Sequence, residues 1–302
     1  MLTAKRRRAV SVLGRPQVRF AAAVLIPTLI WYSVFVLVPI IQTIQISLLD
    51  YHLLDPSRNR WVALDNFAHL IANPLFPVAV VNTLTWTVLA IVVIVPISLL
   101  LAQCLVIVRR GRTVYQAVIF VPVVVSLVAV ALIFRILMDP EVGLFNKILT
   151  SLGLPALAWL SSSDSALPVL LGIASWKTIG VFVVILTAGM LNIPTEIYEA
   201  ARVDGANGVQ LFRRITLPLL GHTLALVLVL LTIGSLQEFT LPTVVTQGGP
   251  GDSTFLYNML IFQEAFVDLR FGTASAASLL QFVVILVASM IWLRLLRPSW
   301  SY

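Results

Sequence analysis

Six long apolar segments determine what this chain of 302 residues can fold into. An α-helix needs about 20 mostly apolar residues to cross the hydrocarbon core of a bilayer, and each of the six is long enough. They lie at residues 20 to 48, 77 to 107, 115 to 138, 166 to 191, 218 to 240 and 274 to 296. We therefore predict an all-α membrane protein with six transmembrane helices.

The composition supports this class and excludes several others. Hydrophobic residues make up 59% of the chain, charged residues 11%, and the mean hydropathy is +1.00, which is too apolar for a soluble domain. The single cysteine, Cys104, rules out an intrachain disulfide framework. The net charge of +7 raises the question of nucleic acid, but the basic residues bracket apolar segments, so we expect a lipid bilayer and no nucleic acid as partner.

The Lys and Arg residues also predict the orientation of the helices in the membrane. Six lie in the N-terminal tail, three in the second connection, three in the fourth and two at the C-terminal end, against four in the other connections. By the positive-inside rule, both termini and the fourth connection are cytosolic. A cleaved signal peptide is the alternative for the basic start, but the apolar run after Arg19 is longer than a typical signal core, so we expect a retained first span.

The sequence predicts a single membrane domain. We divide it into a basic cytosolic tail at 1–19 and a transmembrane domain at 20–302, which contains a polar loop at 192–217. On the other side, residues 64 to 71 predict a short interfacial helix, and the stretch from Thr246 to Gly251 is a strong turn signal.

The polar loop has the pattern of two short helices. Thr195 is a candidate cap for the first, and Gly205 is expected to break it. Asn207 followed by Gln210 resembles a capping box that starts the second helix, and Pro218 suits the first turn of the next span. The loop is thus predicted to form a compact helix-turn-helix; an ordinary amphipathic connector is the alternative.

The residues of this loop resemble the Glu-Ala-Ala signature of permease subunits of bacterial ATP-binding-cassette (ABC) importers. The resemblance implies a multi-pass protein of the bacterial inner (plasma) membrane with a type I importer permease fold. It further implies docking of the loop on a cytosolic ABC ATPase dimer. It also implies that this chain is not an enzyme and has no cofactor of its own, since ATP and magnesium would be bound by the ATPase. The matching positions are Glu199, Ala200, Ala201, Asp204, Gly205, Ala206, Phe212, Ile215, Leu217 and Pro218.

Motifs elsewhere are similar to the carbohydrate-uptake, maltose-type branch of this family. They imply a sugar-like solute, a second homologous permease with which this chain forms a heterodimer, and an extracytoplasmic solute-binding protein. The matching residues are Asp65-Asn66-Phe67, Asn82-Thr83-Leu84, the turn at Thr246 to Pro250, Ser253-Thr254 and Ala265-Phe266.

Polar residues within spans indicate a solute path, because each is unfavourable in lipid. By the same resemblance, the path includes Trp176, Lys177, Thr178, Gln237 and Glu238. A cation and a carboxylate depart from the family pattern, which makes glycerol 3-phosphate or a glycerophosphodiester an alternative solute. The alternatives to a path are a structural Lys177–Glu238 ion pair and a Glu238 side chain that reaches the outer headgroup region.

Other functions have little support in the sequence. None of the three lysines follows glycine, so no phosphate-binding Gly-Lys loop exists, and His52, His69 and His222 are too scattered to suggest a metal site. A passive channel would not need a cytosolic docking loop, and a membrane enzyme acting on lipid should show clustered acids or histidines at one interface.

Overall fold

The structure is a computed structural model, and it describes residues 15–108 and 110–296. The part of the predicted tail at 1–14, together with Arg109 and Arg297, lies outside the described residues. The described part contains five helical segments that are long and apolar enough to cross a membrane, and a sixth segment is formed by a bent pair. The five are Phe20–Ser47, Leu75–Ile107, Ser163–Leu191, Gly221–Val245 and Phe271–Leu295.

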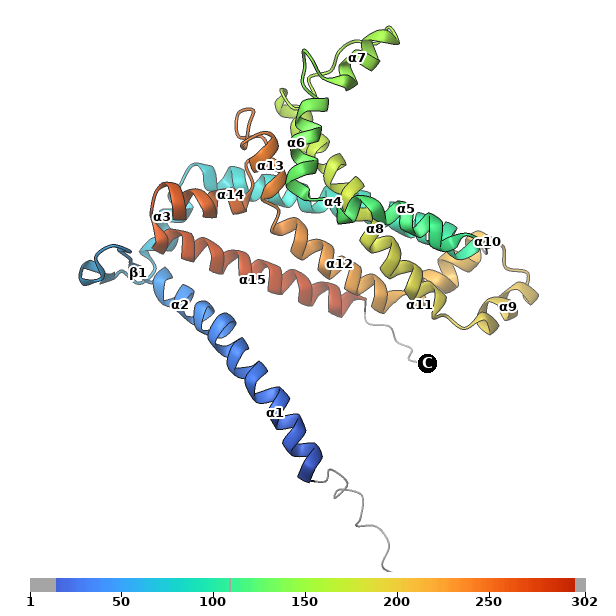
Figure 1. The fold of residues 1–302 in the computed structure, drawn as a ribbon, viewed down its shortest axis with the longest axis horizontal. Helices are drawn as coiled ribbons and strands as arrows, with labels where there is room; N and C mark the ends of the chain where they lie inside the picture. Colours follow the sequence, from blue (N-terminus) through green and yellow to red (C-terminus); the bar gives the residue numbers. More distant parts are fainter. Residues whose placement is uncertain (1–14, 109, 297–302) are drawn as a thin grey trace, which may run out of the picture.

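The first span stands apart from the rest (Figure 1). It consists of α1 (Arg15–Tyr32), the π-helical turn η1 (Ser33–Leu37) and α2 (Val38–Ser47), which follow one another without a break. Its most apolar window is not buried by the chain at all, and only α2 packs against another span, α15 (Phe271–Leu295). The remaining helices form the bundle.

The centre of the bundle is the pair α4 (Leu75–Ile107) and α8 (Ser163–Leu191), with α5 (Arg112–Val124) and α12 (Gly221–Leu236) beside it. Trp86, Leu170 and Leu186 are buried between these helices. Gly180 permits the close approach of α8 to α5, since a Cβ there would lie 2.5 Å from the carbonyl oxygen of Ile119. Small residues allow this kind of contact between membrane helices.

The third predicted span is not a single straight helix. It is divided into α5 and α6 (Leu127–Leu137), whose axes differ by 86°. Val125 and Ser126 between them have extended backbone, and Pro122 lies in the last turn of α5. Pro122 has no backbone N–H and disfavours a continuous helix, which favours an end of α5 close to it, inside an apolar run.

Beyond α6, residues 139–165 form an arm that contains α7 (Leu144–Ser151) and projects from the bundle (Figure 1). Buried Asn146 organises it: the side-chain amide donates to the carbonyls of Pro140 and Leu157 at 3.2 and 3.0 Å. Its oxygen accepts from Leu157 N and from the Trp159 indole at 3.0 and 2.9 Å. This one side chain therefore connects the segments that precede and follow α7, and holds the arm together.

The fifth span is also interrupted. After α12 the chain turns at residues 237–239 into α13 (Thr240–Val245), which packs against α6. The predicted turn after Thr246 is present, with left-handed backbone at Gln247, Gly248, Gly251 and Asp252. Asn82 of α4 secures it by donating to the carbonyls of Asp252 and Phe255 at 2.8 and 3.1 Å.

The chain then continues through α14 (Tyr257–Phe262), the π-helical turn η4 (Gln263–Val267) and α15. At this end of the bundle, the predicted short helix is present as α3 (Asp65–Ala72). Asn66 of α3 donates to the carbonyls of Ser47 and Leu49, which fixes the end of α2. The connection before α3 contains the antiparallel strands β1 (Leu49–Asp50) and β2 (Arg60–Trp61) and the 3-10 turn η2 (Pro56–Arg58).

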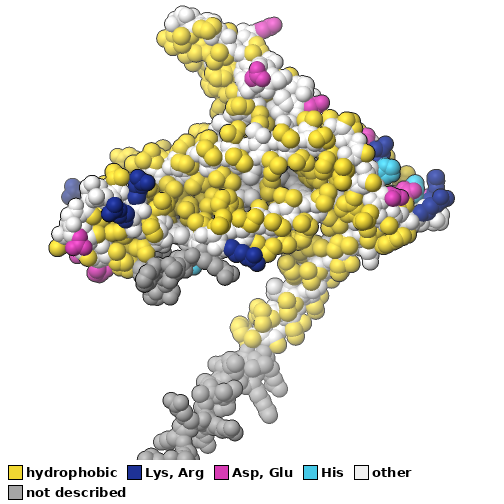
Figure 2. Space-filling model, turned by 180° about the vertical axis from the view of Figure 1, so that it is seen from behind, with side chains coloured by type: hydrophobic (Ala, Val, Ile, Leu, Met, Phe, Trp, Pro, Cys, Tyr) yellow, Lys and Arg dark blue, Asp and Glu magenta, His cyan; other side chains and the backbone are white. Residues whose placement is uncertain are grey.

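The surface shows how the bundle relates to the membrane. In Figure 2, the middle of the visible face is hydrophobic, whereas charged side chains gather toward its two ends. The apolar middle is formed by spans with exposed Val, Leu and Ile side chains, such as Val92 and Val283. This band matches a lipid-facing surface.

Candidate functional site

A cavity that contains both polar and apolar side chains lies where both interrupted spans meet α8. It has a volume of about 240 Å³ and is lined by residues at both helix breaks and by one face of α8. The α8 face has the spacing i, i+3, i+4, i+7, which places four side chains on one side of a helix. The lining residues are Ala174, Lys177, Thr178 and Val181 of α8, Val123 and Leu127 at the first break, and Glu238 and Leu241 at the second.

Lys177 stabilises the first break. Its ammonium group donates to the carbonyl oxygen of Val123 at 3.0 Å and approaches that of Pro122 at 3.4 Å. Both carbonyls belong to the last turn of α5; that of Pro122 accepts from the Val125 N–H at 3.4 Å, and Lys177 supplies a donor for that of Val123. A cation at a helix C-terminus is also favoured by the helix dipole. The lysine therefore compensates for the interruption of the third span.

Glu238 has the complementary position at the second break. One carboxylate oxygen accepts from the backbone N–H groups of Phe239 and Leu241, at 3.1 and 3.0 Å. These donors lie at the start of α13, where a negative charge is favoured. The described residues contain one side-chain ion pair, His52–Asp50, so Lys177 and Glu238 do not pair with each other in this conformation.

The five predicted path residues are not all brought together. Lys177, Thr178 and Glu238 line the cavity, and Thr178 and Glu238 also line an adjoining one of about 170 Å³ beside Trp86 and Phe182. Trp176 points elsewhere on α8 and packs against Phe134 of α6, with ring centroids 5.7 Å apart. The side chain of Gln237 is exposed next to the second break and lines neither cavity.

Sequence reasoning missed the remaining lining residues. Ala174, Val181, Val123 and Leu241 have no polar group that would single them out. For Ala174 and Val181, the available signal was their spacing from Lys177, which places them on the same face of α8. The contributions from α5 and α13 depend on how the helices pack and had no signal in the sequence.

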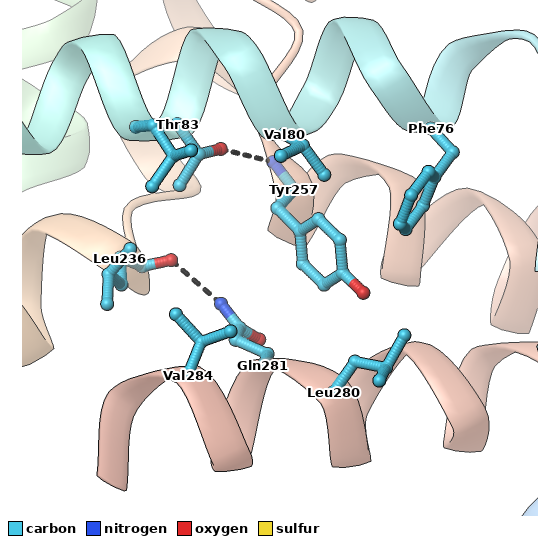
Figure 3. A pocket seen from close by; sticks show the side chains of 9 residues that line it. Phe76, Val80, Thr83, Leu236, Tyr257, Leu280, Gln281 and Val284 are labelled. Atoms are coloured by element: carbon cyan, nitrogen blue, oxygen red, sulfur yellow. Dashed lines mark hydrogen bonds between the residues drawn. The ribbon is translucent and has the colours of Figure 1, made fainter. Parts of the chain in front are cut away.

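A third cavity, of about 250 Å³, is apolar and lies between α4, α12, α14 and α15 (Figure 3). The polar groups on its wall are already bonded: Thr83 accepts from the Tyr257 N–H at 2.8 Å, and Gln281 donates to the Leu236 carbonyl at 2.7 Å. It offers little to a polar solute, so the cavity between the two breaks is the better candidate for a path.

The loop at 192–217 forms the predicted pair of short helices. The first is α9 (Thr195–Val203), with Glu199, Ala200 and Ala201 in its second half. It ends at Asp204 because Gly205 adopts left-handed backbone, with φ +80°. The N–H groups of Gly205 and Ala206 donate to the carbonyls of Arg202 and Ala201 at 3.0 and 2.9 Å, which is the Schellman arrangement of a helix end.

The second helix starts with the predicted capping box. The Asn207 side chain accepts from Gln210 N at 2.9 Å, and the Gln210 side chain accepts from Asn207 N at 2.8 Å. α10 (Gly208–Leu211) then continues through the π-helical turn η3 (Phe212–Thr216) into α11 (Leu217–Leu219) and α12. Phe212 and Ile215 lie in η3, and Leu217 and Pro218 in α11.

One detail of the loop prediction was wrong. Thr195 is the first residue of α9 and not its cap; Pro194 has the cap position and no side chain caps the helix. Pro194 has extended backbone there, which leaves Thr195 inside the first turn.

The loop is fixed to the bundle at its base and exposed at its tip. Tyr198 and Thr216 are joined by a hydrogen bond of 3.0 Å between their hydroxyl groups, and Phe212 packs against the main core. Glu199 and Ala200 are exposed, as is Val203, whose exposed fraction of 88% is unusual for an apolar side chain. An exposed tip with an apolar side chain, on a base that is bonded to the bundle, is suited to contact with another protein.

Interrupted membrane helices around a cavity that contains charged side chains are typical of membrane transporters. Residues 94–302, more than two thirds of the chain, match the model of the family described as binding-protein-dependent transport system inner membrane component. The chain therefore belongs to this family: it is a multi-pass inner membrane protein and a non-catalytic permease subunit that works with partner subunits. The expected importer-permease fold is thereby confirmed.

Named relatives extend over nearly the whole chain. The arabinooligosaccharides transport system permease protein AraP of Bacillus subtilis (strain 168) is 31% identical, over 89% of this chain and 86% of its own length. The trehalose/maltose transport system permease protein MalF of Thermococcus litoralis is 31% identical, over 95% and 97%. A chain in the crystal structure of a bacterial ABC transporter involved in the import of the acidic polysaccharide alginate is similar with a TM-score of 0.82 and 26% identity, over 96% of this chain and 98% of that one.

Proposed function

We propose that this chain forms half of the translocation path for a carbohydrate in an ABC importer, and that the cavity between the two helix breaks is part of this path. The observation that carries the proposal is the position of Lys177, Thr178 and Glu238 around one cavity inside the spans. Ion and solute sites of transporters commonly lie where membrane helices are interrupted. The second homologous permease and an external solute-binding protein would complete the transporter.

We further propose that the loop at 192–217 docks on a cytosolic ATPase, with both chain termini on the same side of the membrane. The loop, the start of α5 and the end of α15 lie toward one end of the bundle (Figure 1). Arg112, Arg213 and Arg294 belong to these segments, and such a concentration of basic residues supports a cytosolic location.

For the solute, a carbohydrate is favoured over glycerol 3-phosphate or its diesters. The two named relatives transport arabinooligosaccharides and trehalose or maltose, according to their names. In addition, the charge of Lys177 is already directed at the carbonyls of α5, and that of Glu238 at the N–H groups of α13. A phosphate would have to compete with these helix ends, whereas a hydroxyl-rich neutral solute would not.

A cavity-filling substitution tests the path. Ala174 lines both polar cavities, so Ala174→Phe should block uptake of neutral oligosaccharides while the complex still assembles. Leu132→Phe is the matched control, because Leu132 is 47% exposed and lies on α6 away from both cavities. Uptake into vesicles should be measured with neutral oligosaccharides and with glycerol 3-phosphate. Normal uptake by Ala174→Phe contradicts the path, and uptake of glycerol 3-phosphate alone contradicts the carbohydrate.

A further inference from the structure

A further cavity, at the base of the loop, lies outside the proposed solute path. It has a volume of about 390 Å³ and is lined by Val209, Gln210, Arg213 and Arg214 of α10 and η3. Both arginines are exposed, and among residues 15–108 and 110–296 neither has a carboxylate partner within 4.0 Å. Two guanidinium groups beside one cavity form a site for an anion.

These two arginines differ from other arginines whose side chains bond to backbone carbonyl groups of the bundle. Arg112 donates to the carbonyls of Leu105 and Val106 at 2.9 and 3.0 Å, and so closes the end of α4. Arg135 reaches the carbonyl of Val244 at 3.4 Å. Arg213 and Arg214 have no comparable structural partner on α4 or α13, which leaves their planar groups free for a ligand.

The chemistry of the site selects phosphate. Guanidinium groups bind phosphate oxygens through paired N–H donors, more specifically than an ammonium group does. The Gln210 side-chain oxygen is already used, since it accepts from Asn207 N, so its NH₂ group remains as a further donor. A cavity that presents donors but no carboxylate fits a ligand with several acceptor oxygens.

The position of the cavity favours a lipid as the source of that phosphate. Arg214 lies seven residues before Gly221, where the fifth span begins, which is about 10 Å along a helix. The headgroup layer on each side of the hydrocarbon core is about 5 to 8 Å deep, within reach of a long arginine side chain. Val209 beside the arginines is apolar and 67% exposed, which suits the boundary between headgroups and acyl chains.

We propose that Arg213 and Arg214 bind the phosphate of an anionic phospholipid at the membrane surface next to the loop. The bound lipid would hold η3, and with it the base of the helix pair, at a constant depth in the membrane. Since Tyr198 of α9 is hydrogen-bonded to Thr216 of η3, the lipid would also limit the movement of α9.

The test uses the complete importer, purified with its partner permease and ATPase, and titrated with phosphatidylglycerol while bound lipid is counted by native mass spectrometry. Arg213→Gln with Arg214→Gln should weaken one tight site about 30-fold, which corresponds to about 2 kcal/mol for two basic residues. Arg58→Gln with Arg60→Gln is the matched control at the opposite end of the spans and should leave that site unchanged. Arg213→Lys with Arg214→Lys keeps the charge but removes the paired N–H donors, so its binding should lie between that of the unchanged importer and that of the double Gln variant.

Several results would overturn the proposal. Unchanged phosphatidylglycerol binding by the double Gln variant would remove the arginines from any lipid site. Equal binding of phosphatidylcholine would show that the site does not select lipids by their net negative charge. Displacement of the lipid by millimolar inorganic phosphate would assign the cavity to small anions, and binding only after removal of the ATPase would assign it to a protein contact.

Discussion

Replacement of Lys177 by Met separates the three roles that this residue can have. In the structure, the ammonium group donates one good hydrogen bond, to Val123 at 3.0 Å, and a longer one to Pro122 at 3.4 Å. A hydrogen bond from a charged donor contributes about 1.5 to 3 kcal/mol, and the longer contact adds little. We therefore expect Lys177→Met to destabilise the assembled complex by about 2 kcal/mol through loss of the cap on α5.

The assay is a double-mutant cycle on the stability of the purified complex, with Glu238→Gln as the second change. Because Lys177 and Glu238 bond to different helix ends, the two effects should be nearly additive, with an interaction energy below about 1 kcal/mol. Lys147→Met is the control, since Lys147 lies in the projecting arm and has no partner within a span. Solute binding by the external protein should be the same for all variants.

Two results would refute this reasoning. An interaction energy of about 3 kcal/mol or more, with recovery of stability in the double variant, would mean that the residues form a buried ion pair. Normal stability combined with selective loss of uptake of an anionic solute would mean that Lys177 recognises the solute and does not hold the helix end.

Three further predictions concern the loop and the arm. Gly205→Val should leave membrane insertion intact but abolish uptake, because a β-branched residue opposes φ +80° by roughly 1–2 kcal/mol. Gly208→Ala is the control and should transport normally in the same uptake assay. A Cβ at Gly208 meets open space, and this glycine does not have left-handed backbone. Glu199→Lys reverses a charge on the exposed face of α9 and should uncouple ATP hydrolysis from uptake. Normal solute-stimulated hydrolysis together with normal uptake would disprove this prediction. Asn146→Ala removes four hydrogen bonds from the arm and should make residues 139–165 sensitive to limited proteolysis, whereas Lys147→Ala should not.

The sequence predicted those features that depend on local chemistry. The apolar runs marked the spans to within a few residues at most ends, and Asn207 with Gln210 marked a capping box that the structure contains. Gly205 was identified as a helix break because few other residues adopt left-handed backbone without strain. These signals come from residues close together in the chain.

The two helix breaks could not be predicted in the same way. The run from 115 to 138 is apolar apart from Gln116, Ser126 and Arg135, so hydropathy alone cannot distinguish a straight helix from two helices at 86°. The break depends on Lys177, which is more than 50 residues away and supplies the donor that the end of α5 lacks. The second break depends likewise on the fit of α13 against α6. Lys177 and Glu238 stood out as charges in apolar spans, but their partners are backbone groups, which look alike in every sequence.

The isolated position of α1 has a consequence for assembly. Lipid chains are as apolar as the side chains of this helix, so no hydrophobic force draws it back to the bundle. Packing within this chain therefore does not fix its orientation, which depends on what surrounds it in the bilayer. Since α2 packs against α15, the helix is tethered, and a neighbouring protein surface would meet it at a high effective concentration without a second diffusional encounter.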